Sequence, residues 1–263
     1  VHNFSPHRPL GQAYTYPFRV LASMGSWYEA FKAGKCNEDQ ARYWQRKKAE
    51  ELYVIKRDPF QIRNLIGEKD HRDVLNDLRA KLRDEILSTR DTGLIPEGMY
   101  GRLAGSGTIH EFAQSESYLA DEVLSAASKA VRGDLGIGFS FARKCMQHDS
   151  PLIRYWGVTG ALMLGGEGAP LKDDLTELLD DPVYDVRVVV AEALGHLGES
   201  AKALPVLVKV VNEGNVYESL AAANALEALG RDGAVPMATV KAVMPKKIRA
   251  EGARVVEAIE KIR

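Results

Sequence analysis

The sequence predicts a mainly α-helical fold in two parts, a small α+β part followed by an α-solenoid. Amphipathic helical patterns dominate the chain after residue 108. Within that stretch, a related segment returns every 32 to 33 residues. Near residue 50, one short segment instead has the composition of a strand. We therefore expect a first domain over residues 1–97, a linker over 98–117 and a helical repeat domain over 118–263.

Composition narrows the classes of function. The chain has 263 residues, of which 45% are hydrophobic, so it can bury a substantial core. Its 35 Lys and Arg against 36 Asp and Glu leave a net charge of -1, which gives no indication of a nucleic-acid partner. No run approaches the roughly 18 apolar residues of a membrane span. Cys36 and Cys145 are too few for a disulfide framework and are expected to be ordinary thiols.

The first sixty residues are rich in aromatic residues and proline, which predicts irregular structure with short elements. Short helices are expected over 26–33 and 38–46, with Ser26 and Asn37 as N-caps. Residues 51–55, ELYVI, have strand composition and are stopped by Asp58-Pro59. Residues 1–4 are the candidate for a neighbouring strand, although a single hairpin is marginal in water.

A longer helix is expected next, over residues 69–90. Apolar residues recur there at spacings of three and four, and Gly93 is expected to end the run. The Gly-rich stretch 93–108 is interpreted as a linker that crosses a surface. The apolar positions of the helix are Val74, Leu75, Leu78, Leu82 and Ile86.

The second half of the chain contains an internal repeat. Residues 148–166 align with 180–198 and more loosely with 213–230, and the arginines at 154 and 187 are 33 positions apart. Each unit is expected to be a helical hairpin that buries its apolar face against its neighbours. The Asp-Pro turn, the Val-Arg that follows and the Leu-Gly ending resemble short HEAT-like repeats over roughly 134–263. That resemblance implies an architecture and no chemistry.

Residues 49–97 resemble the C-terminal subdomain of type I sulfatases, in which a strand ELYDLxxDPxExxNL precedes a long helix. The match lies at Glu51-Leu52-Tyr53, Asp58-Pro59 and Asn64-Leu65. The upstream segments NFSPHRPLGQ and SWYEAFKAGKCNEDQARYW also resemble one branch of these enzymes, including members with HEAT-like repeats. The sequence departs from the family pattern at Val54, at Ile62-Arg63 and at Glu85.

The resemblance implies that this chain is the C-terminal, non-catalytic part of an enzyme that hydrolyses sulfate esters or sulfamates of sulfated carbohydrates. The chain would complete a small sheet beside an upstream catalytic domain, which is the implied partner. Formylglycine, made in a C/S-x-P-x-R motif, and calcium belong to that domain. Neither cysteine of this chain lies in such a motif, so we expect no catalytic or metal-binding residue here and no activity of the chain alone. The family also implies a periplasmic or extracellular location.

Candidate substrate-binding residues lie near the start of the chain. His7 and Arg8 stand on a loop braced by prolines and could donate charge-assisted hydrogen bonds to a sulfate or carboxylate. Tyr14, Arg19 and Trp27 could extend the same pocket, because aromatic faces suit sugar rings. The alternative is structural: a loop with solvated charges, and aromatic residues that fill a core.

Candidate partner-binding residues lie in the repeats. Aromatic and Arg side chains recur there at equivalent places, and such residues are favoured as binding anchors. In the alternative, Arg154 pairs with Asp149, Arg187 pairs with Asp181, and Trp156 lies in the core. For the whole chain, the alternatives to the sulfatase interpretation are a stand-alone HEAT-like adaptor that binds a protein and a scaffold with no ligand of its own. A partner recruited by the repeats would be a protein or a sulfated oligosaccharide. The candidates are Arg154, Tyr155, Trp156, Tyr184 and Arg187.

Overall fold

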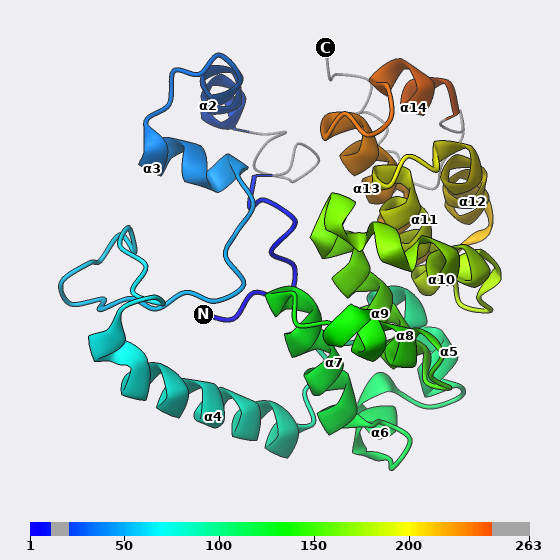
Figure 1. Ribbon diagram of the computed structural model, residues 1–263, viewed down its shortest axis with the longest axis horizontal. Helices are drawn as coiled ribbons and strands as arrows, with labels where there is room; N and C mark the ends of the chain where they lie inside the picture. The colour runs from blue at the N-terminus through cyan, green and yellow to red at the C-terminus, as the bar shows by residue number, and fades with distance from the viewer. Residues whose placement is uncertain (12–20, 244–263) are drawn as a thin grey trace. The chain divides into compact units, whose positions relative to one another are not determined.

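The structure is a computed structural model that describes residues 1–11 and 21–243 (Figure 1). The chain divides into two compact units, Val1–Asp91 and Thr92–Arg263, here called unit 1 and unit 2. Helices dominate the described residues, as predicted, and the only β-pairings recorded there are two isolated bridges. In the described part of the chain, no helix combines the length and the apolar character needed to cross a membrane.

Unit 1 begins with short helices around an aromatic cluster. Helix α2 (Ala22–Lys32) starts four residues before the predicted helix, so Ser26 lies inside it and donates to the Ala22 carbonyl instead of capping. Helix α3 (Glu38–Ala41) has the expected cap, because Asn37 accepts the Gln40 amide at 2.9 Å. The turn η1 (Arg42–Trp44) follows. The rings around Trp44 are Trp27, Tyr28, Phe31 and Tyr43.

The strand predicted over residues 51–55 is wrong. The first residues of the chain do run antiparallel to residues 43–51, but only as isolated bridges from His2 to Glu50 and from Pro9 to Arg46. The physical reason lies in a loop that uses the backbone groups of Leu52. The Leu52 amide donates to the Asn64 side chain at 3.0 Å, and its carbonyl accepts the Leu65 amide at 2.8 Å. The small sheet of the expected subdomain is therefore absent from the described residues.

Helix α4 (Arg72–Thr89), preceded by the turn η2 (Lys69–His71), matches the predicted long helix. It ends at Arg90, which takes the left-handed conformation with φ 51°, three residues before the glycine expected to end it. Of its apolar stripe, only Ile86 is buried. Three other residues of the stripe are exposed to solvent: Val74, Leu78 and Leu82, at 52%, 46% and 39%.

Unit 2 starts with a segment that was expected to be a linker. Residues 93–108 instead contain the turn η3 (Glu97–Met99) and helix α5 (Tyr100–Ala104), and helix α6 (Ile109–Gln114) follows. The boundary between the compact units accordingly falls after Asp91 rather than near residue 97. The reason is apolar content within the glycine-rich stretch: Leu94, Ile95 and Met99 are all buried.

The rest of unit 2 is a stack of helical hairpins. Helices α9, α11 and α13 lie side by side, and α12 packs against α11 and α13 (Figure 1). The expectation that each hairpin buries its apolar face is confirmed at Val186, Val190, Leu194 and Leu207, which are fully buried. The helices of the stack are α7 (Ala120–Arg132), α8 (Ser140–Met146), α9 (Pro151–Leu164), α10 (Lys172–Glu177), α11 (Tyr184–His196), α12 (Ser200–Glu213), α13 (Val216–Arg231) and α14 (Met237–Val243).

Small residues set the spacing of the stack. A Cβ added at Gly195 on α11 would stand 2.6 Å from Leu229 on α13. The α13 alanines at 222 and 225 are fully buried. Because bulkier side chains would force the helices apart, these positions allow the close approach that stacked hairpins require.

Candidate functional site

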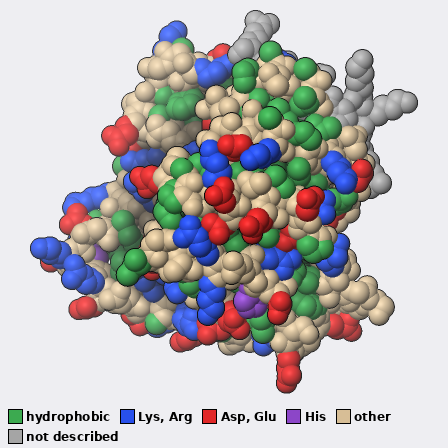
Figure 2. All heavy atoms as spheres, turned by 45° about the vertical axis from the view of Figure 1, so that its right-hand side comes forward, with side chains coloured by type: hydrophobic (Ala, Val, Ile, Leu, Met, Phe, Trp, Pro, Cys, Tyr) green, Lys and Arg blue, Asp and Glu red, His purple; other side chains and the backbone are tan. Residues whose placement is uncertain are grey.

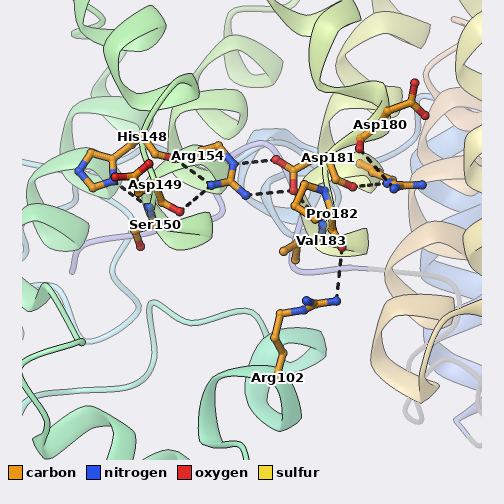
Figure 3. Close-up of polar contacts among 10 residues, drawn as sticks. Arg102, His148, Asp149, Ser150, Arg154, Asp180, Asp181, Pro182 and Val183 are labelled. Atoms are coloured by element: carbon orange, nitrogen blue, oxygen red, sulfur yellow. Dashed lines mark hydrogen bonds and ion pairs between the residues drawn. The ribbon is translucent and has the colours of Figure 1, made fainter.

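The turns that open successive repeats are joined by an arginine. Arg154 on α9 donates to both carboxylate oxygens of Asp181, from Nε at 2.6 Å and from Nη2 at 3.1 Å (Figure 3). Its Nη1 donates to the carbonyls of His148 and Asp149, both at 2.8 Å. The side chains of Arg154 and Asp181 are 12% and 1% exposed. A bidentate pair buried to this degree fixes one turn to the next.

The expected partners of the two arginines need correction. Arg154 pairs with the carboxylate of Asp181, one repeat further on. With Asp149 it makes a hydrogen bond to the backbone carbonyl and not to the carboxylate. Arg187 donates to the carbonyls of Asp180 and Asp181 rather than to a carboxylate. The cause is the shape of guanidinium, whose two edges can serve different groups. One edge of Arg154 holds its own turn, and the other reaches the turn that follows.

Beyond these contacts, unit 2 presents a polar and aromatic patch at the start of α11 and α13. The Tyr184 hydroxyl donates to Glu213 at 2.9 Å, and the hydrogen bond to this carboxylate raises the pKa of Tyr184. The Arg187 guanidinium stands 5.3 Å from the centre of the Tyr184 ring. Tyr217 is 49% exposed at the start of α13. We call Tyr184, Arg187, Glu213 and Tyr217 the repeat patch.

Sequence reasoning missed Tyr217, although a signal was present. Positions 184 and 217 differ by 33, which is the spacing of the two arginines, and both tyrosines follow a valine. The two rings therefore come from equivalent places in neighbouring repeats. Such a spacing marks a feature that the stack displays more than once.

The remaining two candidates in the repeats differ in exposure. Trp156 is buried, and its Nε1 donates to the Leu94 carbonyl at 3.0 Å. Tyr155 is half-buried and meets the Trp156 ring edge-on, with the ring centres 5.4 Å apart. Trp156 thus lies in the core, as its structural alternative predicted, while Tyr155 retains some accessible surface.

The candidates of unit 1 occupy different local settings. His7 and Arg8 are half-buried in the N-terminal segment, where the Arg8 amide donates to the Ser5 carbonyl at 3.2 Å. Trp27 belongs to the aromatic cluster, and its Nε1 donates to the Gln40 carbonyl at 3.0 Å. The other two, Tyr14 and Arg19, lie outside the described residues.

The motif residues that carry the sulfatase resemblance build a loop. Asp58 accepts the amides of Ile62 and Arg63 at 3.0 and 2.9 Å, and the bond from Ile62 is the chief reason that the pKa of this carboxyl is lowered. Asn64 accepts the amides of Leu52 and Ile66 at 3.0 and 3.1 Å. Within the described ranges, no cluster of three or more His, Cys, Asp or Glu residues could hold a metal ion.

Comparison with known proteins gives one match. The HEAT repeat family model matches residues 173–201, which hold most of α10, all of α11 and the start of α12. The match covers 29 of 263 residues, so it identifies one repeat within the stack. No curated protein and no solved structure matches the chain significantly.

Proposed function

We propose that unit 2 is a helical-repeat scaffold that binds a protein partner through the repeat patch. The observation that carries this proposal is the HEAT repeat match inside a stack that displays Tyr184 and Tyr217 at equivalent places. Stacked helical hairpins form extended surfaces that suit macromolecular partners. Tyrosine and arginine are the side chains most often found as anchors in such contacts.

The chemistry of the repeat patch favours a polypeptide over a small ligand. Neighbouring helices in a stack are about 8–10 Å apart, so the two tyrosines address points separated by a similar distance. Each phenol combines an apolar ring with a hydroxyl, while Arg187 supplies a cation and Glu213 an anion. On the face shown in Figure 2, acidic and basic side chains of the described residues are intermixed with hydrophobic ones. A partner of mixed character fits such a surface better than a polyanion does.

Site-specific photo-cross-linking tests the proposal. A photoreactive residue at Tyr217 is expected to capture one predominant protein from an extract of the source cells, and the same residue at Arg187 should capture that protein too. Lys202 is the matched control, because its side chain is 48% exposed and it lies at the opposite end of α12 from Glu213. Capture of the same protein from position 202 with equal yield, or of none from 187 and 217, would overturn the proposal.

A second candidate function is the non-catalytic C-terminal part of a sulfatase. Two observations in unit 1 favour it. Its motif residues Asp58 and Asn64 fold into one hydrogen-bonded loop. The stripe on α4 also stays exposed at Leu78 and its neighbours, and apolar surface of this kind usually contacts another protein or domain. An upstream catalytic domain would cover that stripe, and His7 and Arg8 would be its nearest candidates for substrate contact.

In this second candidate, formylglycine and calcium would belong to the catalytic domain, since neither Cys36 nor Cys145 lies in a C/S-x-P-x-R motif. The coding sequence upstream of Val1 provides the test. An α/β domain with that motif, together with sulfate release by the full product but not by this chain, is the expected result. An in-frame stop shortly before Val1 with no such motif would remove the sulfatase candidate and leave the scaffold.

A further inference from the structure

Residues 94–102, here called the strap, lie across the row formed by α9, α11 and α13. Trp156 on α9 donates to the Leu94 carbonyl at 3.0 Å, and Asn215, the N-cap of α13, donates to the Gly98 carbonyl at 2.8 Å. At the far end, Arg102 donates to the Pro182 carbonyl at 3.3 Å, just before α11 (Figure 3). The strap is therefore fixed to each helix of the row by a polar contact.

Two carboxylates from neighbouring repeats meet beneath the middle of the strap. Asp185 on α11 and Glu218 on α13 differ by 33 positions, so the stack places them at the same level. A Cβ added at Gly98 would stand 2.6 Å from Asp185 Oδ2 and 2.7 Å from Glu218 Cγ. Position 98 therefore accepts only glycine while the strap is closed, because any side chain would collide with the acidic pair.

The two acids are satisfied to different degrees. Glu218 accepts the Asn215 amide at 2.7 Å in a capping box. Asp185 is 4% exposed, and its Oδ2 has no hydrogen-bond partner among the described residues. A buried oxygen without a donor is costly when it carries charge and far less costly when it carries a proton.

The surroundings of Asp185 disfavour its charge. Burial is the main cause, and the Glu218 carboxylate adds to it, while Arg102 acts in the opposite direction. Together these influences raise the pKa of Asp185 to about 7. The charged groups that face Asp185 are thus one acid from α13 and one cation from α5.

We propose that the acidic pair makes the attachment of the strap dependent on pH. The strap is held firmly while Asp185 is protonated under Gly98, and it opens more often once two adjacent carboxylates are ionised there. The buried side chains of Leu94, Ile95 and Met99 keep the strap mostly closed at either pH. The protonation state of the acidic pair therefore changes how often the strap opens, without releasing it permanently.

The direction follows from proton linkage. An opened strap exposes Asp185 to water, where its pKa returns toward the ordinary 3.8, whereas the closed state holds the proton up to about pH 7. Between those values the closed state binds one more proton, so a rise in pH favours opening by up to about tenfold per pH unit. Attachment is strongest below about pH 4, weakens towards pH 7 and is constant above it.

Hydrogen exchange of the strap amides from pH 5 to pH 8, divided by the intrinsic exchange rate at each pH, tests the proposal. We expect protection in the strap to fall by about ten- to a hundredfold up to pH 7 and then to level off. Amides of α12 serve as the internal reference. Asp185→Asn keeps the shape and removes the titration, so its strap should show no such pH dependence.

Two further results keep the proposal falsifiable if that variant fails to fold. The Asp185 carboxyl carbon of the wild-type chain, followed by NMR, should titrate near pH 7, and a midpoint near 4 would overturn the proposal. Glu218→Gln should shift the loss of protection to lower pH. A strap that loses protection equally in wild type and Asp185→Asn would also overturn it. All these measurements use the chain alone, so they are independent of the partner proposed for the repeat patch.

Discussion

Helix α11 in unit 2 and helix α4 in unit 1 bury their apolar residues to very different extents. Along α11 nearly every apolar side chain is buried, whereas α4 buries Ile86 alone. Pattern and neighbours differ together: α11 carries apolar residues on most of its faces and is packed by α9, α12 and α13, whereas α4 carries a single apolar stripe. A repeat provides its own packing partners, and a single amphipathic helix depends on what lies beside it.

The two units also differ in what fixes their turns. In unit 2 the turns are joined by a buried ion pair from Arg154 to Asp181. In unit 1 the turns are instead fixed by side chains that accept hydrogen bonds from backbone amides, as at Asp58 and Asn64. The ion pair links separate repeats, while the loop contacts are local. Substitutions at these contacts should therefore destabilise a wide region of unit 2 but only the local loop in unit 1.

The largest expected effect comes from the ion pairs. Asp181→Ala leaves a buried guanidinium without its carboxylate and should cost unit 2 about 3–5 kcal/mol of unfolding free energy. Glu50→Ala removes the bidentate partner of Arg79; the Glu50 side chain is 10% exposed but Arg79 is 41% exposed and stays hydrated, so the variant should cost unit 1 less, about 1–2 kcal/mol. Denaturant-induced unfolding, monitored by hydrogen exchange of the amides within each unit, measures both losses of unfolding free energy.

A control separates charge from packing in that experiment. Joint replacement by Arg154→Met and Asp181→Leu removes both charges and should cost less than Asp181→Ala alone. Equal losses of unfolding free energy from Asp181→Ala and Glu50→Ala would contradict the difference proposed between the two units.

Leucine truncation should give the next largest difference. Leu194→Ala, at a fully buried site, should cost about 2–5 kcal/mol, whereas Leu78→Ala, at a site 46% exposed, should stay within about 0.5 kcal/mol. Thermal unfolding of the two variants measures this. If a longer product of the gene makes Leu78→Ala as costly as a core truncation, then α4 is covered there, which would favour the second candidate function.

Two capping boxes that begin with asparagine, one in each unit, allow a closer comparison. Asn37→Ala removes the cap of α3 and should cost about 1 kcal/mol locally. Asn215→Ala removes the cap of α13 together with the bond to the Gly98 carbonyl and should cost about 1–2 kcal/mol. Asn215→Ser is the matched control, since it keeps a capping oxygen but no amide donor. If Asn215→Ser loses as much as Asn215→Ala, the bond to the strap dominates over the cap.

The smallest effect concerns the two thiols and leaves stability unchanged. Burial raises the pKa of the Cys145 thiol to about 11, so almost none of it is thiolate at pH 8. Cys36 is partly exposed. An aromatic disulfide reagent should therefore label Cys36 in the native chain, and Cys145 only after unfolding. Simultaneous labelling of both would show that unit 2 opens more readily than its packing implies.

Repetition made much of unit 2 predictable from sequence. The 33-residue spacing indicated the helices that became α9, α11 and α13, because the same apolar positions return in each unit. The partner of Arg154 was harder to predict. Asp149 and Asp181 both lie in turns within reach of an arginine, and only the observed stacking shows that the carboxylate comes from the following repeat.

Single segments were less predictable than repeated ones. Glycine in the strap suggested a linker, but at Gly98 it is needed for contact with Asp185 rather than for flexibility. Residues 51–55 have strand composition, yet no adjacent ladder forms there because Asn64 takes the Leu52 amide. Tyr184 and Arg187 stay predictions as binding residues, and Tyr217, at the equivalent place one repeat later, was not among the predicted residues.

The arginine that joins turns also defines a unit that could be duplicated. Arg187 stands where Arg154 stands in the preceding repeat, but the next turn offers Gly214 in place of an aspartate. A second copy of residues 181–213, inserted after Glu213, would place a new aspartate 27 positions after Arg187, which is the separation of Asp181 from Arg154, and a new arginine within the added repeat. Such an insertion should lengthen the stack by one hairpin and extend the row of tyrosines from two to three. The length of the array can therefore be increased in steps of 33 residues.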